Sequence, residues 1–194
     1  MATTEQVWAL YDAVPAHLAP AILLGAFVGL RTAEASGLRV ADVDFMRGVV
    51  SPAVQWPGEP LKTESSRTPI PIPGELALEL SSAVARWPGQ TVVTDGSGGA
   101  APPWSLERAV RAARKPASLP EAFRFHDLRH YLASMLIAAG ADVKVVQARL
   151  RHASATTTMN TYGHLMPDAD ESARAAVGAV LAARADSLRT RRTS

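Results

Sequence analysis

Apolar residues recur at the spacing of an α-helix over most of this chain. The first series starts after Thr3 and Thr4, either of which can cap a helix, and it stops before Pro15. In a short segment at 32–37, Thr32 can cap the start and Gly37 can end the helix. The same periodicity predicts further helices at about 15–30, 74–87, 104–115, 125–139, 143–150, 156–162 and 168–188.

The pattern changes between residues 40 and 73. Short β-rich runs, VDF, VVSPAV and TPIPIP, are separated there by Gly, Pro and polar residues, which is typical of a small antiparallel sheet. A brief apolar strand is also expected at 91–94. The sequence therefore predicts a mainly α fold with a small antiparallel β-sheet (α+β). We expect a single domain over 1–188 and a basic flexible tail over 189–194.

Composition narrows the class of protein. The chain has 194 residues, of which 47% are hydrophobic and 20% are charged, so it can bury a substantial core. It has no cysteine, which excludes disulfides, a Cys-based zinc site and thiol catalysis. The N-terminus lacks a basic region, and the apolar run 19–30 is too short to span a bilayer. A soluble, intracellular protein is expected.

Charge is distributed unevenly along the chain. Residues 1–110 contain 7 basic and 11 acidic residues, whereas residues 111–194 contain 13 and 7, so the net charges are −4 and +6. The basic C-terminal part favours a polyanionic partner. Of the 20 basic residues, 17 are arginine, which fits forked recognition of phosphate or a GC-rich coding bias.

The most informative local phrase is FRFHDLRHYLASMLIAAG. His126 and Arg129 are three residues apart on its predicted helix, so they project from nearly the same face and can reach one phosphate. A solvated helix face is the alternative. An apolar stripe on the opposite side is expected to be buried, and it consists of Leu128, Leu132, Met135 and Leu136.

Downstream, VVQARLRHASATTTMNTYGHLMPD places His152 just after a helix end and Tyr162 after a polar cluster. Together with HDLRH, this phrase closely resembles the tyrosine recombinase (phage integrase) family. GLRTAEASGLRVADVDF resembles the family segment that bears its first arginine, and LKTESSRTPIPIP resembles the β-turn that bears its lysine. The resemblance covers residues 4–168. It selects six site residues: Arg31, Lys62, His126, Arg129, His152 and Tyr162.

The resemblance implies a role for each of these residues. Tyr162 would be the nucleophile that forms a 3′-phosphotyrosyl link and releases a 5′-hydroxyl, while Arg31 and Arg129 would hold the scissile phosphate. Lys62 would protonate the leaving 5′-oxygen. His126 would help Tyr162 to lose its proton, and His152 would donate a hydrogen bond to the phosphate. No metal, nucleotide or other cofactor is implied.

Several neighbouring residues stand outside this catalytic set. Glu34 can orient Arg31 or extend a capping pattern, and it is not included in the catalytic set. His130 and His164 are interpreted as structural supports. The chain has Arg151 where the family usually has a glycine, so arginine must adopt a positive φ or mark a different turn. Arg151 could also add a phosphate contact.

The resemblance further implies a site-specific DNA recombinase, an integrase, of which this chain is the catalytic domain without the N-terminal core-binding domain. Its partners would be double-stranded DNA at core sites, a homotetramer on that DNA, and accessory DNA-bending or directionality proteins. The isolated domain would be a monomer or weak oligomer in the bacterial cytoplasm. The helix at 168–188 would be exchanged between subunits or would pack on its own chain.

Two other classes of protein remain open. A type IB topoisomerase shares the chemistry of a tyrosine nucleophile. A non-catalytic regulator could use the helices at 125–139 and 143–150 as a helix-turn-helix, although it would have no use for Arg31, Lys62 and Tyr162 together.

Overall fold

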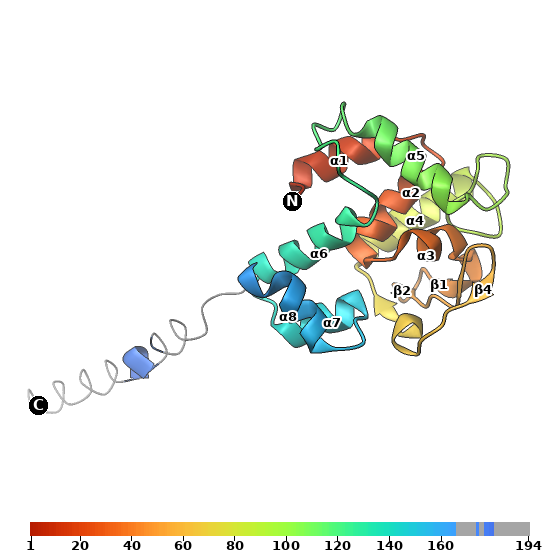
Figure 1. Ribbon diagram of the computed structural model, residues 1–194. Coiled ribbons are helices and arrows are strands. Elements are labelled where there is room, and N and C mark those ends of the chain that lie inside the picture. Colours follow the sequence, from red (N-terminus) through yellow and green to blue (C-terminus); the bar gives the residue numbers. More distant parts are fainter. Residues whose placement is uncertain (166–173, 175–176, 181–194) are drawn as a thin grey trace, which may run out of the picture.

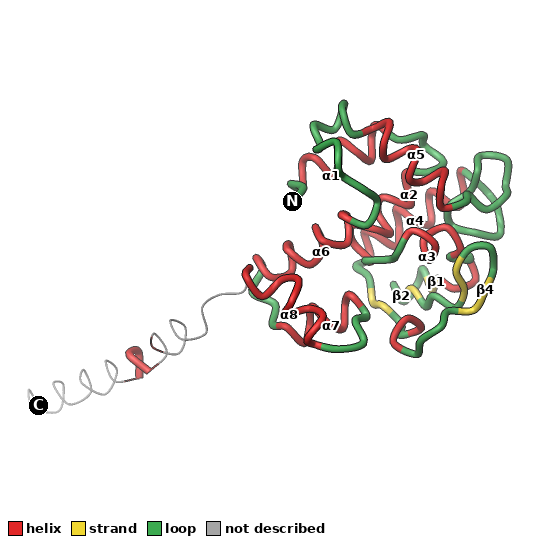
Figure 2. The backbone as a smooth tube through the Cα atoms, viewed as in Figure 1, coloured by secondary structure: helices red, strands yellow, loops and turns green. Residues whose placement is uncertain are grey.

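A computed structural model of the protein describes residues 1–165, 174 and 177–180. Helices account for most of these residues, and the strands gather at one side (Figures 1 and 2). The fold class predicted from the sequence is confirmed. The α-helices are α1 (Thr4–Ala13), α2 (Ala19–Leu23), α3 (Thr32–Gly37), α4 (Gly74–Arg86), α5 (Pro103–Ala113), α6 (Asp127–Ala138), α7 (Val143–Leu150) and α8 (Ala155–Tyr162).

The first helices form the centre of the larger core. Thr3 and Gln6 make a reciprocal capping box at the start of α1, which buries Val7 and Leu10. The predicted helix at 15–30 is only partly confirmed, because α2 begins at Ala19 and passes into a π-helical turn, η1 (Leu24–Val28). This turn ends at Gly29, which has φ +76° and leads the chain directly to Arg31.

The predicted sheet is divided in two. Strands β1 (Val43–Asp44), β2 (Val49–Val50) and β5 (Ile70–Pro71) form an antiparallel sheet in the order β1-β2-β5. Val50 pairs with both Val43 and Ile70. The segment Ser51–Ala53 separates β2 from β3 (Val54–Gln55), which pairs with β4 (Glu59–Pro60) as a hairpin. The strand expected at 91–94 is wrong, since Thr91 and Thr94 form only isolated bridges.

Gly37 ends α3, as the sequence predicts, and it also permits a close contact between two backbones. It is the last residue of α3, but a Cβ built on it would lie 2.5 Å from the carbonyl carbon of Gln55 and the amide nitrogen of Trp56. The amide of Trp56 also donates to the carbonyl of Ala33 at 2.8 Å. Glycine therefore allows α3 to lie directly against the backbone of β3.

Gly37→Ala is expected to lower the free energy of unfolding by about 1–3 kcal/mol, because the methyl group forces helix and strand apart. Gly74→Ala is the matched control, since nothing lies within 4 Å of a Cβ built at this helical position. Urea unfolding of both variants measures the difference. Equal stability of the two variants would contradict the close approach.

Two apolar clusters meet along α6. Phe125, Leu128 and Tyr131 belong to the larger cluster, whereas Leu132 and Ile137 belong to a smaller one formed with α7 and α8. The predicted stripe is therefore partly wrong: Leu128 and Leu132 are buried, but Met135 is 37% exposed. Figure 1 shows α6 running from the larger part of the molecule to α7 and α8.

Of the C-terminal predictions, the helix at 168–188 and the tail at 189–194 lie outside the described residues, except that residues 174 and 177–180 are helical. Within the part of the chain that the structure describes, no helix is long and apolar enough to cross a membrane.

Candidate active site

Arg31 lies at the entrance of α3, where the chain leaves the π-helical turn. The carboxylate of Glu34 accepts hydrogen bonds from the Arg31 backbone amide at 3.0 Å and from its guanidinium at 2.8 Å. Glu34 therefore caps the helix and orients Arg31 at once, and the capping role expected of Thr32 is wrong. The Arg31 side chain remains 42% exposed, so it can contact a ligand.

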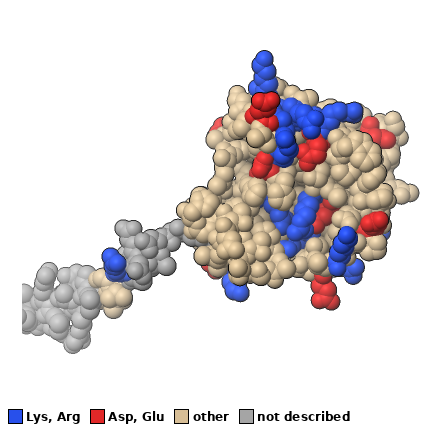
Figure 3. Space-filling view, viewed as in Figure 1, with Lys and Arg blue, Asp and Glu red and all other residues tan. Residues whose placement is uncertain are grey.

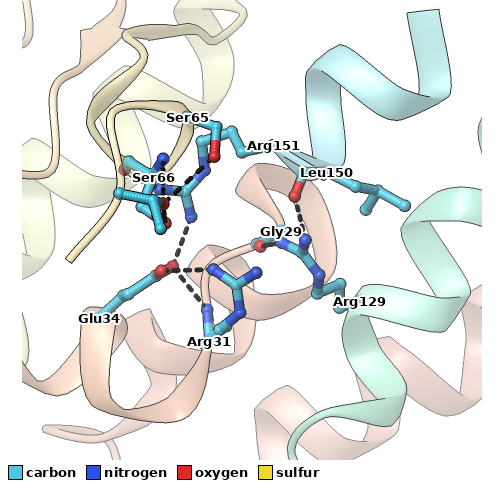
Figure 4. Close-up of polar contacts among 9 residues, drawn as sticks. Gly29, Arg31, Glu34, Ser65, Ser66, Arg129, Leu150 and Arg151 are labelled. Atoms are coloured by element: carbon cyan, nitrogen blue, oxygen red, sulfur yellow. Dashed lines mark hydrogen bonds and ion pairs between the residues drawn. The ribbon is translucent and has the colours of Figure 1, made fainter. Parts of the chain in front are cut away.

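Arg129 is buried between the two apolar clusters and is only 2% exposed. Its guanidinium donates to the carbonyl of Gly29, where η1 ends, and to the carbonyl of Leu150, where α7 ends. Gly29 is required at this approach, because an added Cβ would lie 2.8 Å from Leu132 Cδ2. Figure 4 shows the guanidinium groups of Arg31 and Arg129 side by side.

Arg151 occupies the left-handed region, with φ 51° and ψ 40°. Its amide donates to the carbonyl of Ala148 and the amide of His152 donates to that of Gln147, which together make a Schellman motif. Arginine adopts this turn at a backbone cost of about 1–2 kcal/mol relative to a right-handed conformation. The same turn that glycine would form is therefore present, and it places His152 directly after α7.

The side chain of Arg151 points inward and is fully buried. Its guanidinium donates to the carboxylate of Glu34 and to the carbonyl of Ser66 (Figure 4). The suggestion that Arg151 contacts phosphate is therefore not supported by this structure. Burial alone would raise the pKa of Glu34, but Arg151 and then the Arg31 amide and charge lower it below its usual value.

Lys62 lies in the predicted turn, between β4 and β5. Its side chain is exposed and has no ion pair or hydrogen bond with any residue that the structure describes. The surrounding loop, residues 61–67, is closed on itself: the Arg67 guanidinium donates to the Leu61 carbonyl at 2.8 Å, and the hydroxyls of Thr63 and Ser66 are 2.7 Å apart. Lys62 is thus a free cation on a defined loop.

The tyrosine hydroxyl has a partner that sequence reasoning assigned to a supporting role. Tyr162 Oη lies 2.7 Å from Nδ1 of His130, and Tyr162 is only 3% exposed. His126, which was expected to help Tyr162, packs edge-on against the ring of His130 with centroids 5.1 Å apart. Burial raises the pKa of Tyr162, against the opposing charge of Arg129, so the hydroxyl is protonated at neutral pH. In the sequence, the i, i+4 spacing of His126 and His130 was the feature that places the two rings together on one helix face, where His130 is as close to the site as His126.

His152 is half-buried, and its Nδ1 lies 2.9 Å from the hydroxyl of buried Thr158. Burial, followed by the charges of Arg129 and Arg31, lowers the pKa of His152 to about 4, so the ring is neutral at neutral pH. When Thr158 donates to Nδ1, the ring proton is on Nε2 and is available to a ligand.

We expect His152 to titrate well below 6.5 in the folded chain. Because the folded pKa is below the unfolded one, its contribution to stability is present above pH 6.5 and is lost as the pH falls toward about 4. An NMR titration of the imidazole protons, assigned with a His152→Asn variant, measures this. A midpoint near 6.5 would mean that neither burial nor the neighbouring arginines act on the pKa of this ring.

Positive charges within the site act on one another. Arg31 and Arg151 add to burial in lowering the pKa of Arg129 to about 10, and Arg129 and Arg31 lower the pKa of His126, after burial and His130. Figure 3 shows Lys and Arg side chains gathered along the middle of one face of the molecule. Such mutual repulsion is relieved by an anion. Among the described residues, no group of His, Asp or Glu side chains is arranged to hold a metal.

The site thus brings arginine guanidinium groups, histidine rings and a tyrosine hydroxyl together on a mainly helical domain. The chain belongs to the phage integrase family, whose model matches residues 2–168. The family resemblance drawn from the sequence is confirmed.

Two curated relatives illustrate the similarity. Tyrosine recombinase XerC of Methylobacterium sp. (strain 4-46) is 33% identical over 139 residues, which are 71% of this chain and 42% of that protein. Tyrosine recombinase XerD of Mycobacterium leprae is 31% identical in an alignment of 140 positions that covers 67% of this chain and 42% of that protein. The chain spans less than half the length of these relatives.

Solved structures share the fold. The Tn1549 transposon integrase in complex with transposon right end DNA superposes with a TM-score of 0.74 at 22% identity, over 93% of this chain and 65% of that one. A lambda integrase tetramer bound to a Holliday junction gives 0.63 at 20% identity, over 86% and 48% of the two chains.

Proposed function

We propose that this chain is the catalytic part of a site-specific DNA recombinase. The observation that carries the proposal is that Arg31 and Arg129 lie beside His126 and His152, whose pKa values burial and these two arginines lower, with the hydroxyl of Tyr162 at the same site. A phosphodiester supplies the anion that such a set needs, and the tyrosine supplies a nucleophile. The relatives that are named tyrosine recombinases support this assignment.

In the proposed reaction, Tyr162 Oη attacks the phosphorus atom and the bond to the 5′-oxygen breaks. Arg31 and Arg129 stabilise the added negative charge, since each guanidinium offers parallel N–H donors. Lys62 gives its proton to the leaving 5′-oxygen. The bond energy stays in the 3′-phosphotyrosyl link, so a 5′-hydroxyl of another strand can reverse the attack without nucleotide hydrolysis.

The histidines have distinct parts in this proposal. With Nδ1 unprotonated, His130 accepts the hydroxyl hydrogen of Tyr162 and can take the proton as the attack proceeds. His126 faces His130 and supports its ring. His152 donates from Nε2 to a phosphate oxygen, because Thr158 holds its other nitrogen.

Access to the tyrosine is part of the mechanism. Because Tyr162 is 3% exposed, a DNA phosphate cannot meet its hydroxyl in this arrangement. We infer that α8 shifts slightly when DNA binds, so that the Tyr162 hydroxyl meets the phosphate held by Arg31 and Arg129 while Tyr162 stays within reach of His130 and Thr158 within reach of His152. The break between α7 and α8, at exposed Ala153 and Ser154, is the place for such a movement.

The proposed substrate is double-stranded DNA at a core site, and the proposed assembly is a tetramer on that DNA. The solved lambda integrase tetramer bound to a Holliday junction supports this assembly for a chain of the same fold. We further propose that the chain is a single catalytic domain of a longer recombinase, which acts on DNA in the bacterial cytoplasm.

The experiment uses nicked duplexes whose sequence beside the nick is randomised. Attack at a phosphate near the nick releases a short oligonucleotide, so the 3′-linked protein–DNA product accumulates and can be recovered under denaturing conditions. Sequencing of the linked DNA should reveal a preferred core site. Linked DNA without any preferred sequence, together with relaxation of arbitrary plasmids, would favour a topoisomerase. DNA binding without a linked product would favour a regulator.

A further inference from the structure

One buried side chain joins three segments of the candidate active site. Arg151 follows α7 immediately and precedes His152, and its guanidinium contacts both Glu34 and the carbonyl of Ser66. Glu34 is the residue that orients Arg31. Ser66 belongs to the 61–67 loop, which also contains Lys62. The contacts therefore link the phosphate-binding arginine to the loop of the lysine.

The left-handed backbone at Arg151 disfavours an arginine, so the contacts of its side chain must offset that cost. A Schellman turn with φ 51° favours glycine, and an arginine is unfavourable there unless its side chain makes compensating contacts. Those contacts are buried and charge-assisted, since Arg151 is fully buried and Glu34 is 3% exposed at the side chain. Arg67, Thr63 and Ser66 bond within the loop itself, and the amide of Leu61 donates to the carbonyl of Ala53 at 3.2 Å. Arg151 supplies the bond that joins the loop to Glu34.

We propose that Arg151 is a positioning residue that fixes the Lys62 loop relative to Arg31 and Glu34. This inference rests on the proposed function, in which Lys62 protonates the leaving oxygen while Arg31 holds the phosphate. Arg151 does not touch the DNA. Instead, Arg151 determines whether Lys62, the acid, and Arg31, which holds the phosphate, face the same phosphodiester bond.

Arg151→Gly tests the proposal cleanly. Glycine is the residue that the left-handed turn prefers, so the turn and His152 should stay in place while the guanidinium is lost. Arg149→Ala is the matched control, because Arg149 also lies at the end of α7 and donates to a backbone carbonyl, that of Pro71, but not to Glu34 or the 61–67 loop. Arg151→Lys retains the charge but not the fork that serves two acceptors.

The first readout is the placement of the loop and needs no DNA chemistry. Amide hydrogen exchange should become faster at residues 61–67 in Arg151→Gly, and to a lesser extent in Arg151→Lys. It should remain unchanged in Arg149→Ala. If exchange at 61–67 is the same in Arg151→Gly as in the parent chain, the positioning role is refuted whether or not the chain is a recombinase.

The second readout separates acid placement from general damage. On ordinary DNA, formation of the covalent product should slow by up to about 10²-fold in Arg151→Gly, as expected when a reacting group is displaced by about an ångström. A substrate with sulfur in place of the bridging 5′-oxygen releases a thiolate that needs little protonation. On this substrate, Arg151→Gly and Lys62→Ala should both form the covalent product at close to the parent rate, whereas Arg129→Lys should remain slow.

The outcomes distinguish the two levels of inference. Recovery of Lys62→Ala without recovery of Arg151→Gly would overturn the positioning role. If Lys62→Ala itself does not recover, the acid assignment in the proposed function fails. The exchange measurement then still decides whether Arg151 holds the loop.

Discussion

Tyr162→Phe should abolish the covalent protein–DNA product and leave DNA binding intact. The substitution removes only the hydroxyl oxygen that attacks phosphorus, so product formation should fall by at least about 10³-fold. Loss of the hydrogen bond to His130 should also lower the free energy of unfolding by about 1 kcal/mol. Denaturing gels with nicked DNA measure the product, and a mobility shift measures binding.

Tyr131→Phe is the matched control for this change. Tyr131 is also buried, and its hydroxyl lies 3.0 Å from the hydroxyl of Thr4 at the start of α1, whereas the hydroxyl of Tyr162 bonds to His130. The variant should lose a similar amount of stability and keep its covalent product. If Tyr162→Phe still links to DNA, or Tyr131→Phe does not, the nucleophile has been assigned to the wrong tyrosine.

Local sequence signals were sufficient for most of the helices. The helix over residues 143–150 has the predicted bounds, and α1, α4, α5 and α8 differ by a residue or two at their ends, because periodicity and caps are properties of neighbouring residues. The π-helical turn at Leu24–Val28 was not predictable in this way. The carbonyl of Gly29, at the end of this turn, accepts a hydrogen bond from Arg129, which lies 100 residues later in the chain.

The site shows the same division between local and distant contacts. The six predicted positions come from motifs, and several of their partners are local, but Arg129 and Tyr162 bond to distant segments of the chain. Glu34 is buried against Arg151, which lies 117 residues away, and His130 is bonded to Tyr162, which lies 32 residues away. A motif indicates which residues are present in a site, whereas the fold determines which of them share a proton or a charge.

Arg31→Lys and Arg129→Lys should have equal effects on cleavage and different effects on stability. Either change keeps the positive charge but removes the paired donors that match phosphate, so covalent product formation should fall by about 10²–10³-fold in both. Arg31 is 42% exposed at its side chain, and its replacement should change the free energy of unfolding by less than about 1 kcal/mol.

Arg129→Lys should lower the free energy of unfolding by about 1–3 kcal/mol, because a single ammonium cannot serve both carbonyls and one of them becomes a buried, unpaired acceptor. Those carbonyls, of Gly29 and Leu150, lie at the ends of elements from the two apolar clusters, so the guanidinium that we propose to bind phosphate also holds the clusters together. Urea unfolding of the two variants separates these functions. A stability loss of equal size in both would show that Arg31, and not the buried Arg129 alone, connects the two parts of the core.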